Sequence, residues 1–210
     1  LSYDGAVPAE MALARSLNIP SVFMLQDYGV ERFHALLRKA GFQTINRGAD
    51  HYGLSLILGG AEVSLWDLAG VYASFSRTLN HFYRYSSKYD LTDFRPLNLV
   101  SVAGQQEPGE LVDHGKMGAG AIWQAYEAMV KVNRPTALSN WESFSSMGKI
   151  AWKTGTSFGF RDAWAVGTTP GYVVAVWVGN ADGEGRPGLT GISAAAPLMF
   201  DVFSLLPAGE

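Results

Sequence analysis

The sequence predicts an α+β fold in which a mainly helical part precedes a small antiparallel sheet and a closing helix. Apolar residues recur at helical spacing through much of residues 1–148. In residues 149–206, short runs rich in β-branched and aromatic residues alternate with turns that contain Gly and Pro. We therefore expect residues 1–148 to be mainly helical, with a long loop region at 81–116, and residues 149–206 to hold the strands and the last helix.

The first helix is expected to begin at Pro8 and to stop near Ser16. Proline suits the first turn of a helix, because the N–H group that it lacks would be unpaired there. A second proline, Pro20, disfavours helical geometry at the residue before it and can itself open another helix. Ser16 and Asn18 therefore lie at a junction between two helices, where both side chains can point to one place.

Further helices are expected over residues 30–40, from Ser64 onward, and over residues 120–133. Ser64 precedes an apolar stripe and is followed three residues later by Asp67, the pattern of an N-terminal cap. Residues 81–116 show little periodicity, so we expect loops and short elements there.

Three strands are expected over residues 149–156, 160–167 and 171–179, because these β-prone runs are divided by the turn sequences SFG and TTPG. Strands that follow one another this closely form an antiparallel meander. A Gly-rich loop at residues 183–191 then leads to a closing helix over residues 194–206.

Composition excludes several kinds of function. The net charge of −3 and the scattered Lys and Arg residues give no footprint for nucleic acid. There is no cysteine, which excludes thiol chemistry and zinc–thiolate sites, and the four histidines lack metal-ligand spacing, so no cofactor is expected. The longest apolar run, residues 172–178, is too short to cross a membrane as a helix.

The sequence KTGT places an ammonium group inside a predicted strand. Alternation puts Lys153 and Gly155 on one face, with Thr154 and Thr156 on the other. All four can serve one ligand only on an edge strand, which an extended peptide approaches sideways. The hydroxyls would then hold a terminal carboxylate, and the Thr156 N–H would serve as an oxyanion donor. Alternatively, Lys153 is a solvated edge charge that discourages aggregation, and the threonines are ordinary strand residues.

Longer segments resemble one family in both wording and order. They are MALARSLNIPSV, LRKAGF, GGAEVSLWDLAGVYASFS, AWKTGTSFGFRDAWAVG, VVAVWVGNADGEGRPGLTG and AAAPLMF. Together with Ser16-Leu17-Asn18 and the KTG triplet, these segments resemble the transpeptidase domain of class A penicillin-binding proteins, most of all the penicillin-binding protein 1C subtype. The resemblance is weakest over residues 81–116. The resemblance implies that residues 1–210 are the C-terminal part of a transpeptidase domain, and hence a partial penicillin-binding transpeptidase fold.

The resemblance implies a serine acyl-transfer enzyme of peptidoglycan synthesis on the periplasmic side of the bacterial inner membrane. Its partners would be peptidoglycan stem peptides ending in D-Ala-D-Ala, the lipid-linked precursor and β-lactam antibiotics. By family motif, Ser16 would relay protons, Asn18 would hold the substrate backbone and Lys153 would support Ser16. Thr154, Gly155 and Thr156 would bind substrate. An upstream glycosyltransferase and a membrane anchor are implied as well, outside these residues.

This sequence lacks one motif of the family at its expected position. The nucleophile of the family lies in S-x-x-K and precedes the S-x-N triplet, yet none of the fifteen residues before Ser16 begins that motif. The sole match is Ser146 to Lys149, in a segment that predicts a turn and a strand start. We therefore expect the nucleophile to be absent and the chain alone to be inactive. Two other interpretations remain open: a non-catalytic peptide-binding module and a serine β-lactamase-like hydrolase.

Overall fold

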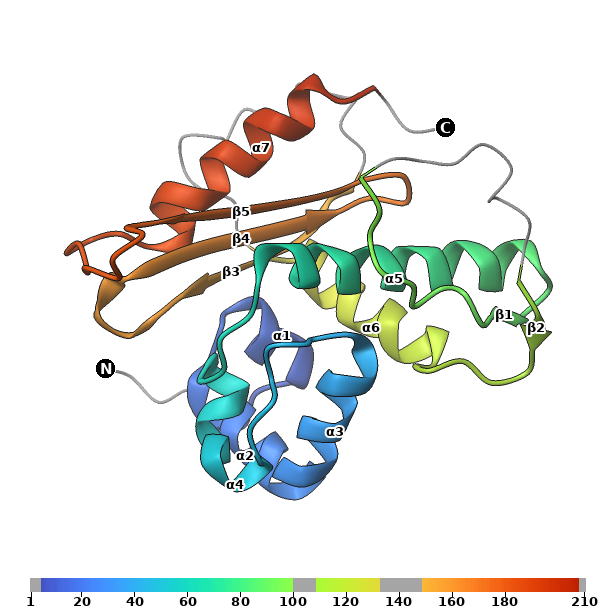
Figure 1. Cartoon of the computed structure of the whole chain (residues 1–210), viewed down its shortest axis with the longest axis horizontal. Helices are drawn as coiled ribbons and strands as arrows, with labels where there is room; N and C mark the ends of the chain where they lie inside the picture. The colour runs from blue at the N-terminus through green and yellow to red at the C-terminus, as the bar shows by residue number, and fades with distance from the viewer. Residues whose placement is uncertain (1–4, 100–108, 133–148, 208–210) are drawn as a thin grey trace.

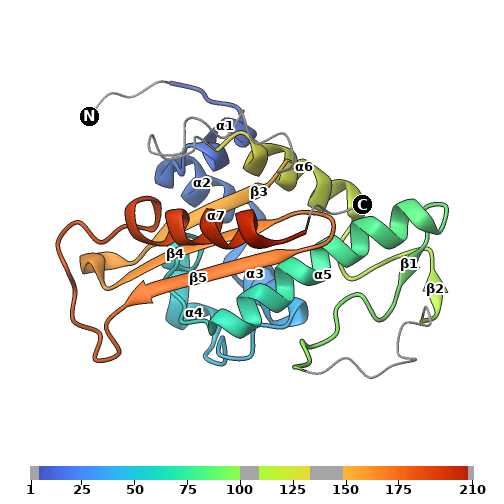
Figure 2. The same ribbon diagram turned by 90° about the horizontal axis from the view of Figure 1, so that it is seen from above.

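The computed structural model describes residues 5–99, 109–132 and 149–207, which form stacked layers (Figure 1). Helix α7 (Ala196–Leu205) covers one face of a three-stranded sheet. Helices α5 (Leu65–Arg84) and α6 (Ala119–Val130) cover the other face. Figure 1 shows α5 and α7 on opposite sides of the strands, and Figure 2 shows α7 lying over them. The expected α+β layering, with helices first and strands last, is confirmed.

The sheet is an antiparallel meander of β3 (Ala151–Thr156), β4 (Asp162–Thr168) and β5 (Val173–Gly179), in that spatial order. Lys153 lies opposite Val166, and Gly155 lies opposite Trp164. Because β4 occupies the centre, β3 is an edge strand of this sheet. That position is the one that sideways approach of a peptide requires.

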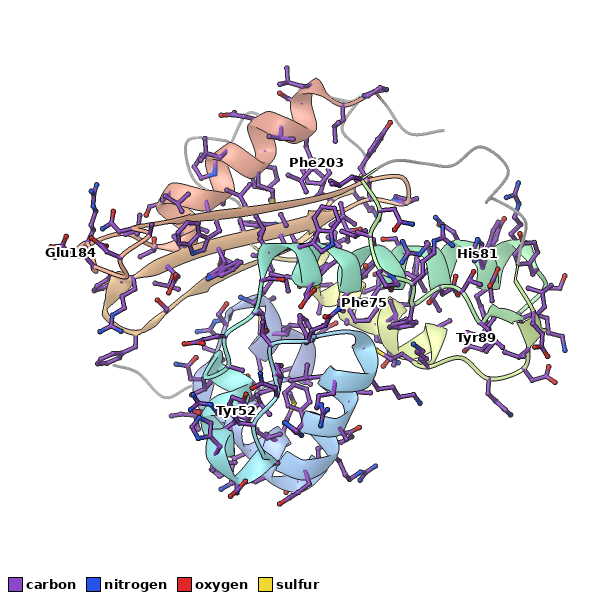
Figure 3. All side chains as sticks on the ribbon, viewed as in Figure 1. Tyr52, Phe75, His81, Tyr89, Glu184 and Phe203 are labelled. Atoms are coloured by element: carbon purple, nitrogen blue, oxygen red, sulfur yellow. The ribbon has the colours of Figure 1, made fainter. Side chains whose placement is uncertain are left out.

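The closing helix packs on the sheet through an apolar core. Trp152 is fully buried, and its ring meets that of Phe200 edge to face, with the centroids 5.0 Å apart. Met199 and Phe203 complete the inner face of α7, and Figure 3 shows Phe203 directed at the strands. A π-helical turn, Gly191–Ala195, precedes α7 and is capped by the side chain of Thr190. The helix expected over 194–206 therefore begins with this wider, i→i+5 bonded turn.

The N-terminal helices form a second, smaller core on the far side of α5 (Figure 1). They are α1 (Ala9–Ala14), α2 (Asn18–Tyr28), α3 (Val30–Ala40), α4 (Ala49–Tyr52) and the 3₁₀ helix η1 (Gly53–Leu58). Buried Leu25, Ile45 and Tyr52 fill its centre, and Val71 of α5 packs against them. The break between α1 and α2 agrees with the junction expected from Pro20, whereas α4 and η1 had no clear sequence signal.

The loop region expected at residues 81–116 is partly wrong, because α5 continues to Arg84. Its start is as expected, since the Ser64 side chain accepts the Asp67 N–H at 3.0 Å. Beyond Phe75 the helix is held by tertiary contacts that a periodicity argument does not contain. Two short strands, β1 (Tyr89–Asp90) and β2 (Leu111–Val112), also pair within the region. None of the described helices is both long and apolar enough to span a membrane.

Candidate active site

Ser16 lies in the tight link between α1 and α2. Its N–H donates to the Leu13 carbonyl (3.1 Å), and the next N–H, of Leu17, donates to the Ala12 carbonyl (2.9 Å). These two bonds end α1 in a Schellman motif, which requires a left-handed residue at its centre. Ser16 supplies that residue with φ of 55°. The link therefore fixes the Ser16 backbone and leaves its hydroxyl exposed.

Lys153 reaches from β3 to this hydroxyl, across 137 residues of sequence. Its Nζ donates to Ser16 Oγ and also to the Thr154 carbonyl, at 2.9 Å. Burial lowers the pKa of the Lys153 ammonium, because the charged form loses hydration there. An ammonium has three N–H donors, so one remains for a ligand. The structure thus brings Ser16 and Lys153 together.

Thr154 and Thr156 lie on the α7 face of β3, opposite to Lys153. Thr156 Oγ1 accepts the N–H of Gly191 at 3.0 Å, so its own hydroxyl proton is free to be donated elsewhere. Gly191 approaches so closely that a Cβ there would lie 2.5 Å from the Gly155 carbonyl oxygen and 2.9 Å from Thr154 Cβ. The π-helical turn before α7 therefore packs against β3 from Thr154 to Thr156.

Gly155 and Asn18 show different degrees of structural constraint. A Cβ on Gly155 would meet Trp164 Cβ at 3.5 Å, which is ordinary van der Waals contact. The fold itself thus tolerates a side chain at Gly155, and the glycine leaves open backbone on an exposed edge. Asn18 is exposed at the first position of α2, two residues after Ser16, and the hydrogen bonds of the described residues do not use its side chain.

The S-x-x-K match at Ser146 falls on residues 133–148, outside the described part of the chain. The described residues also include no cluster of three or more His, Asp or Glu side chains able to hold a metal ion. What the site offers is therefore a lysine-held hydroxyl, an open strand edge and a threonine hydroxyl. Such a set can bind an extended peptide and pass a proton to a leaving group.

Gly191 is the site residue that the sequence alone did not reveal. It ends the Gly-rich loop, and three of the four residues between it and α7 are small, the exception being Ile192. A glycine followed by small residues at a helix start is a signal for close packing of that turn against another backbone. Its partner on β3 lies 35 residues earlier, which no local pattern can indicate.

Sequence comparison with known proteins finds relatives in the family that the motifs resemble. No family model matches the chain. Penicillin-binding protein 1C of Escherichia coli (strain K12) is 34% identical over 204 residues, which is 97% of this chain and 24% of the relative. Penicillin-binding protein 1B of Vibrio cholerae is 30% identical, covering 92% of this chain and 23% of the relative. Penicillin-binding protein 1A of Neisseria meningitidis is 30% identical, covering 99% and 25%. The chain thus spans about a quarter of the length of these relatives.

Solved structures support the fold. Penicillin-binding protein 1A from Haemophilus influenzae superposes with a TM-score of 0.67 at 19% identity, over 100% of this chain and 36% of that one. Penicillin-binding protein A from M. tuberculosis, an imipenem acyl-enzyme complex, gives 0.57 at 17% identity, over 98% and 49%. From the sequence relatives and this shared fold we conclude that the chain is a class A penicillin-binding-protein-like region with the penicillin-binding transpeptidase fold.

Proposed function

We propose that this region supplies the peptide-binding edge and the proton relay of a D,D-transpeptidase that cross-links peptidoglycan. The observation that carries the proposal is the hydrogen bond from Lys153 Nζ to Ser16 Oγ beside the open edge of β3. An edge lysine that only discouraged aggregation would point its ammonium to solvent. Lys153 instead holds a hydroxyl from a distant helix link, with a lowered pKa.

The substrate that suits this edge is an extended peptide with a terminal carboxylate. Its backbone would pair with β3 beside Gly155, where no side chain stands in the way. The free hydroxyl protons of Thr154 and Thr156 would donate to the carboxylate, and Asn18 would hold the peptide backbone. Stem peptides ending in D-Ala-D-Ala have this form. A β-lactam with its carboxylate would take the same place.

The proposed transpeptidation has two steps, acylation of a serine and transfer of the acyl group to an amine. A serine attacks the carbonyl between the two D-Ala residues, the peptide bond breaks, and an ester forms as D-alanine leaves. Ser16 passes a proton to the leaving amine and recovers one, by way of Lys153, from the hydroxyl of the attacking serine, while the Thr156 N–H stabilises the oxyanion. An amine of another strand then attacks the ester, an amide forms, and the serine recovers its proton.

The nucleophilic serine would come from outside the described residues, and the chain of 210 residues alone would be catalytically silent. The relatives are about four times longer, which leaves room for an S-x-x-K segment, a glycosyltransferase and a membrane anchor in a longer protein. We place that protein on the periplasmic side of the bacterial inner membrane, acting on lipid-linked precursor and stem peptides.

The test is labelling with fluorescent penicillin followed by intact-mass analysis. The 210-residue chain should form no stable adduct, and a longer chain that includes an S-x-x-K segment should form one. A stable adduct on Ser146 of the short chain would refute the proposed silence, and an adduct elsewhere would identify a different nucleophile. Continuous turnover of the β-lactam by the longer chain would instead indicate a hydrolase.

The described residues also support a narrower function, peptide binding without chemistry, because the binding edge lies within them. A D-Ala-D-Ala peptide should bind the 210-residue chain, and Thr154→Val or Thr156→Val should weaken that binding. Ser204→Ala, which removes an exposed hydroxyl on α7, serves as the matched control. Equal binding by all four proteins would contradict a role of the threonines in holding the carboxylate.

A further inference from the structure

A pocket separate from the candidate active site opens between α3, α5 and residues 94–97. Its volume is about 280 Å³, and none of its lining residues belongs to the helix link or to β3. Figure 1 shows α3 and α5 as neighbours in the lower half of the molecule. A cavity of this size accepts one amino-acid residue or a group of similar bulk, at the lower end of the range of small-molecule sites.

Buried apolar side chains form part of the pocket lining. Phe42 and Val71 are buried at its base, and both belong to the smaller core. Trp66 lies on the rim with 47% of its surface exposed, which is a large apolar area to leave in water. An aliphatic or aromatic side chain that entered the pocket would cover this surface.

Two arginines, Arg38 and Arg95, line the pocket. Among the described residues, neither Arg38 nor Arg95 takes part in an ion pair. A third, Arg77, lies behind the pocket wall, where it donates to Ser74 Oγ at 3.0 Å and to the Arg95 carbonyl at 3.2 Å. Its guanidinium and that of Arg95 repel each other, and an anion in the pocket would relieve this.

One acidic side chain also faces this space. Asp67 lines the pocket, and its Oδ2 accepts the Gln43 N–H at 3.2 Å, which leaves Oδ1 for another donor. The pocket therefore offers two cations, one carboxylate oxygen and an apolar base. A ligand that matches all three has a carboxylate, an N–H group and an apolar side chain on adjacent atoms.

We propose that this pocket binds the C-terminal residue of a peptide. Its carboxylate lies between Arg38 and Arg95, its amide N–H donates to Asp67, and its apolar side chain covers Phe42 and Val71. Arginine suits this task because its planar donors match a carboxylate in pairs. Capture of a terminal carboxylate is a recurrent mode of peptide recognition, and the volume admits the last residue only.

The experiment is calorimetric titration of the 210-residue chain with acetyl-glycyl-L-leucine and, separately, with acetyl-glycyl-D-alanine. The corresponding C-terminal amides are the controls, since they lack the anionic group. At least one acid should bind, and its amide should bind about fivefold more weakly or not at all. Preference for the L-residue indicates a protein C-terminus as the source, and preference for the D-residue indicates a cell-wall peptide.

Variants assign the binding to the pocket. Arg38→Gln and Arg95→Gln should each weaken binding of the acid about fivefold, and raising the salt concentration should weaken it further. Lys39→Gln removes the same charge from the same turn of α3 but does not line the pocket, so it should have little effect. Circular dichroism checks that each variant is folded.

Two variants distinguish binding in the pocket from binding at the proposed transpeptidase site. Binding in the pocket should be unaffected by Thr156→Val, whereas binding at the β3 edge should be unaffected by Arg38→Gln. The inference is overturned if acids and amides bind equally, if neither acid binds, or if Arg38→Gln and Arg95→Gln behave like Lys39→Gln.

Discussion

Gly191 lies where two strands and the entry to α7 meet. A Cβ at this position would lie 2.5 Å from the carbonyl oxygens of both Gly155 and Trp164. Those oxygens belong to the paired strands β3 and β4, which cannot retreat without breaking their ladder. The N–H of Gly191 also holds the Thr156 hydroxyl. Backbone proximity at this one residue thus sets the geometry of the β3 edge, for which we propose carboxylate binding.

We expect Gly191→Ala to lower the free energy of unfolding by roughly 3 kcal/mol, because overpacking against backbone forces the turn away from the strands. Gly120→Ala is the control. Gly120 lies in α6 with open space around it, so alanine there should be neutral or should stabilise by about 0.5–1 kcal/mol. Chemical denaturation of both variants checks this. An unfolding free energy for Gly191→Ala equal to that of the wild type would contradict the close approach.

The sequence predicted the residues of the candidate site better than the residues that pack behind them. Ser16, Asn18 and KTGT were identified from motifs and from the break at Pro20, and the structure brings Ser16 and Lys153 into contact. The roles of these residues stay predictions. Gly191 was missed because its contact partners are distant in sequence, and a glycine has no side chain whose chemistry could reveal them.

The C-terminal half of α5 shows how an element can extend beyond its periodic signal. Ser74 and Thr78 are buried in it, and their hydroxyls donate back to the Gly70 and Ser74 carbonyls, at 2.8 and 2.9 Å. Farther along, His81 Nδ1 lies 2.6 Å from Asp93 Oδ1, and Figure 3 shows His81 and Tyr89 at the same end of the molecule. His81 thus has a buried partner outside the helix, and the sequence around residues 81–84 gives no sign of it, so these residues were wrongly assigned to the loop region.

Asp90 stabilises the paired strands β1 and β2, which lie at this end of α5. Its Oδ1 accepts the Thr92 N–H (2.8 Å) and hydroxyl (2.7 Å), and its Oδ2 accepts the Gly109 N–H (2.8 Å). Burial alone would raise the pKa of the Asp90 carboxyl. The three hydrogen bonds and nearby His81 outweigh it, so the pKa lies below its ordinary value.

We expect Asp90→Asn to lower the free energy of unfolding by about 1.5–3 kcal/mol at pH 7, since hydrogen bonds to a buried charge are lost. A lowered folded-state pKa stabilises the fold above the ordinary Asp pKa and ceases to do so as pH falls through the folded value. The difference between wild type and variant should therefore shrink below about pH 4.

Thermal unfolding of both proteins at pH 7 and pH 3 measures this difference. Asp113→Asn, at an exposed carboxylate paired with Lys88, is the control and should change the melting temperature little. A difference between wild type and Asp90→Asn that grows on acidification would refute the argument.

At the scale of the molecule, the described residues form two apolar cores, one between the sheet and α7 and one among the N-terminal helices. Helix α5 contacts both the helical core and the sheet. Val71 and Phe75 pack against the helical core, and Ser76 is hydrogen-bonded to Thr168 of β4 at 2.7 Å. Asn80 adds a bond to the Pro170 carbonyl at 2.8 Å, in the turn after β4. The layer order was predictable from sequence, whereas the division into two cores was not, because it depends on which face of α5 meets which partner.

Because one helix is shared, we expect the two cores to unfold together. Leu25→Ala in the helical core and Met199→Ala in the sheet core should each destabilise by about 2–5 kcal/mol. Each should lower a single melting transition, seen alike by far-ultraviolet circular dichroism and by tryptophan fluorescence. Two separated transitions in either variant, with the unmutated core melting at the wild-type temperature, would show that α5 does not couple them.

The contact between Ser16 and Lys153 has a consequence for the order of synthesis. The two residues are 137 positions apart, so at common rates of translation Lys153 is added roughly seven to twenty-seven seconds after Ser16. During that interval α1, α2 and the helical core can form, but the hydroxyl has no ammonium to hold it. The contact thus forms only after β3 has been made, and a protein halted before that point in synthesis would carry Ser16 without the lysine that holds its hydroxyl.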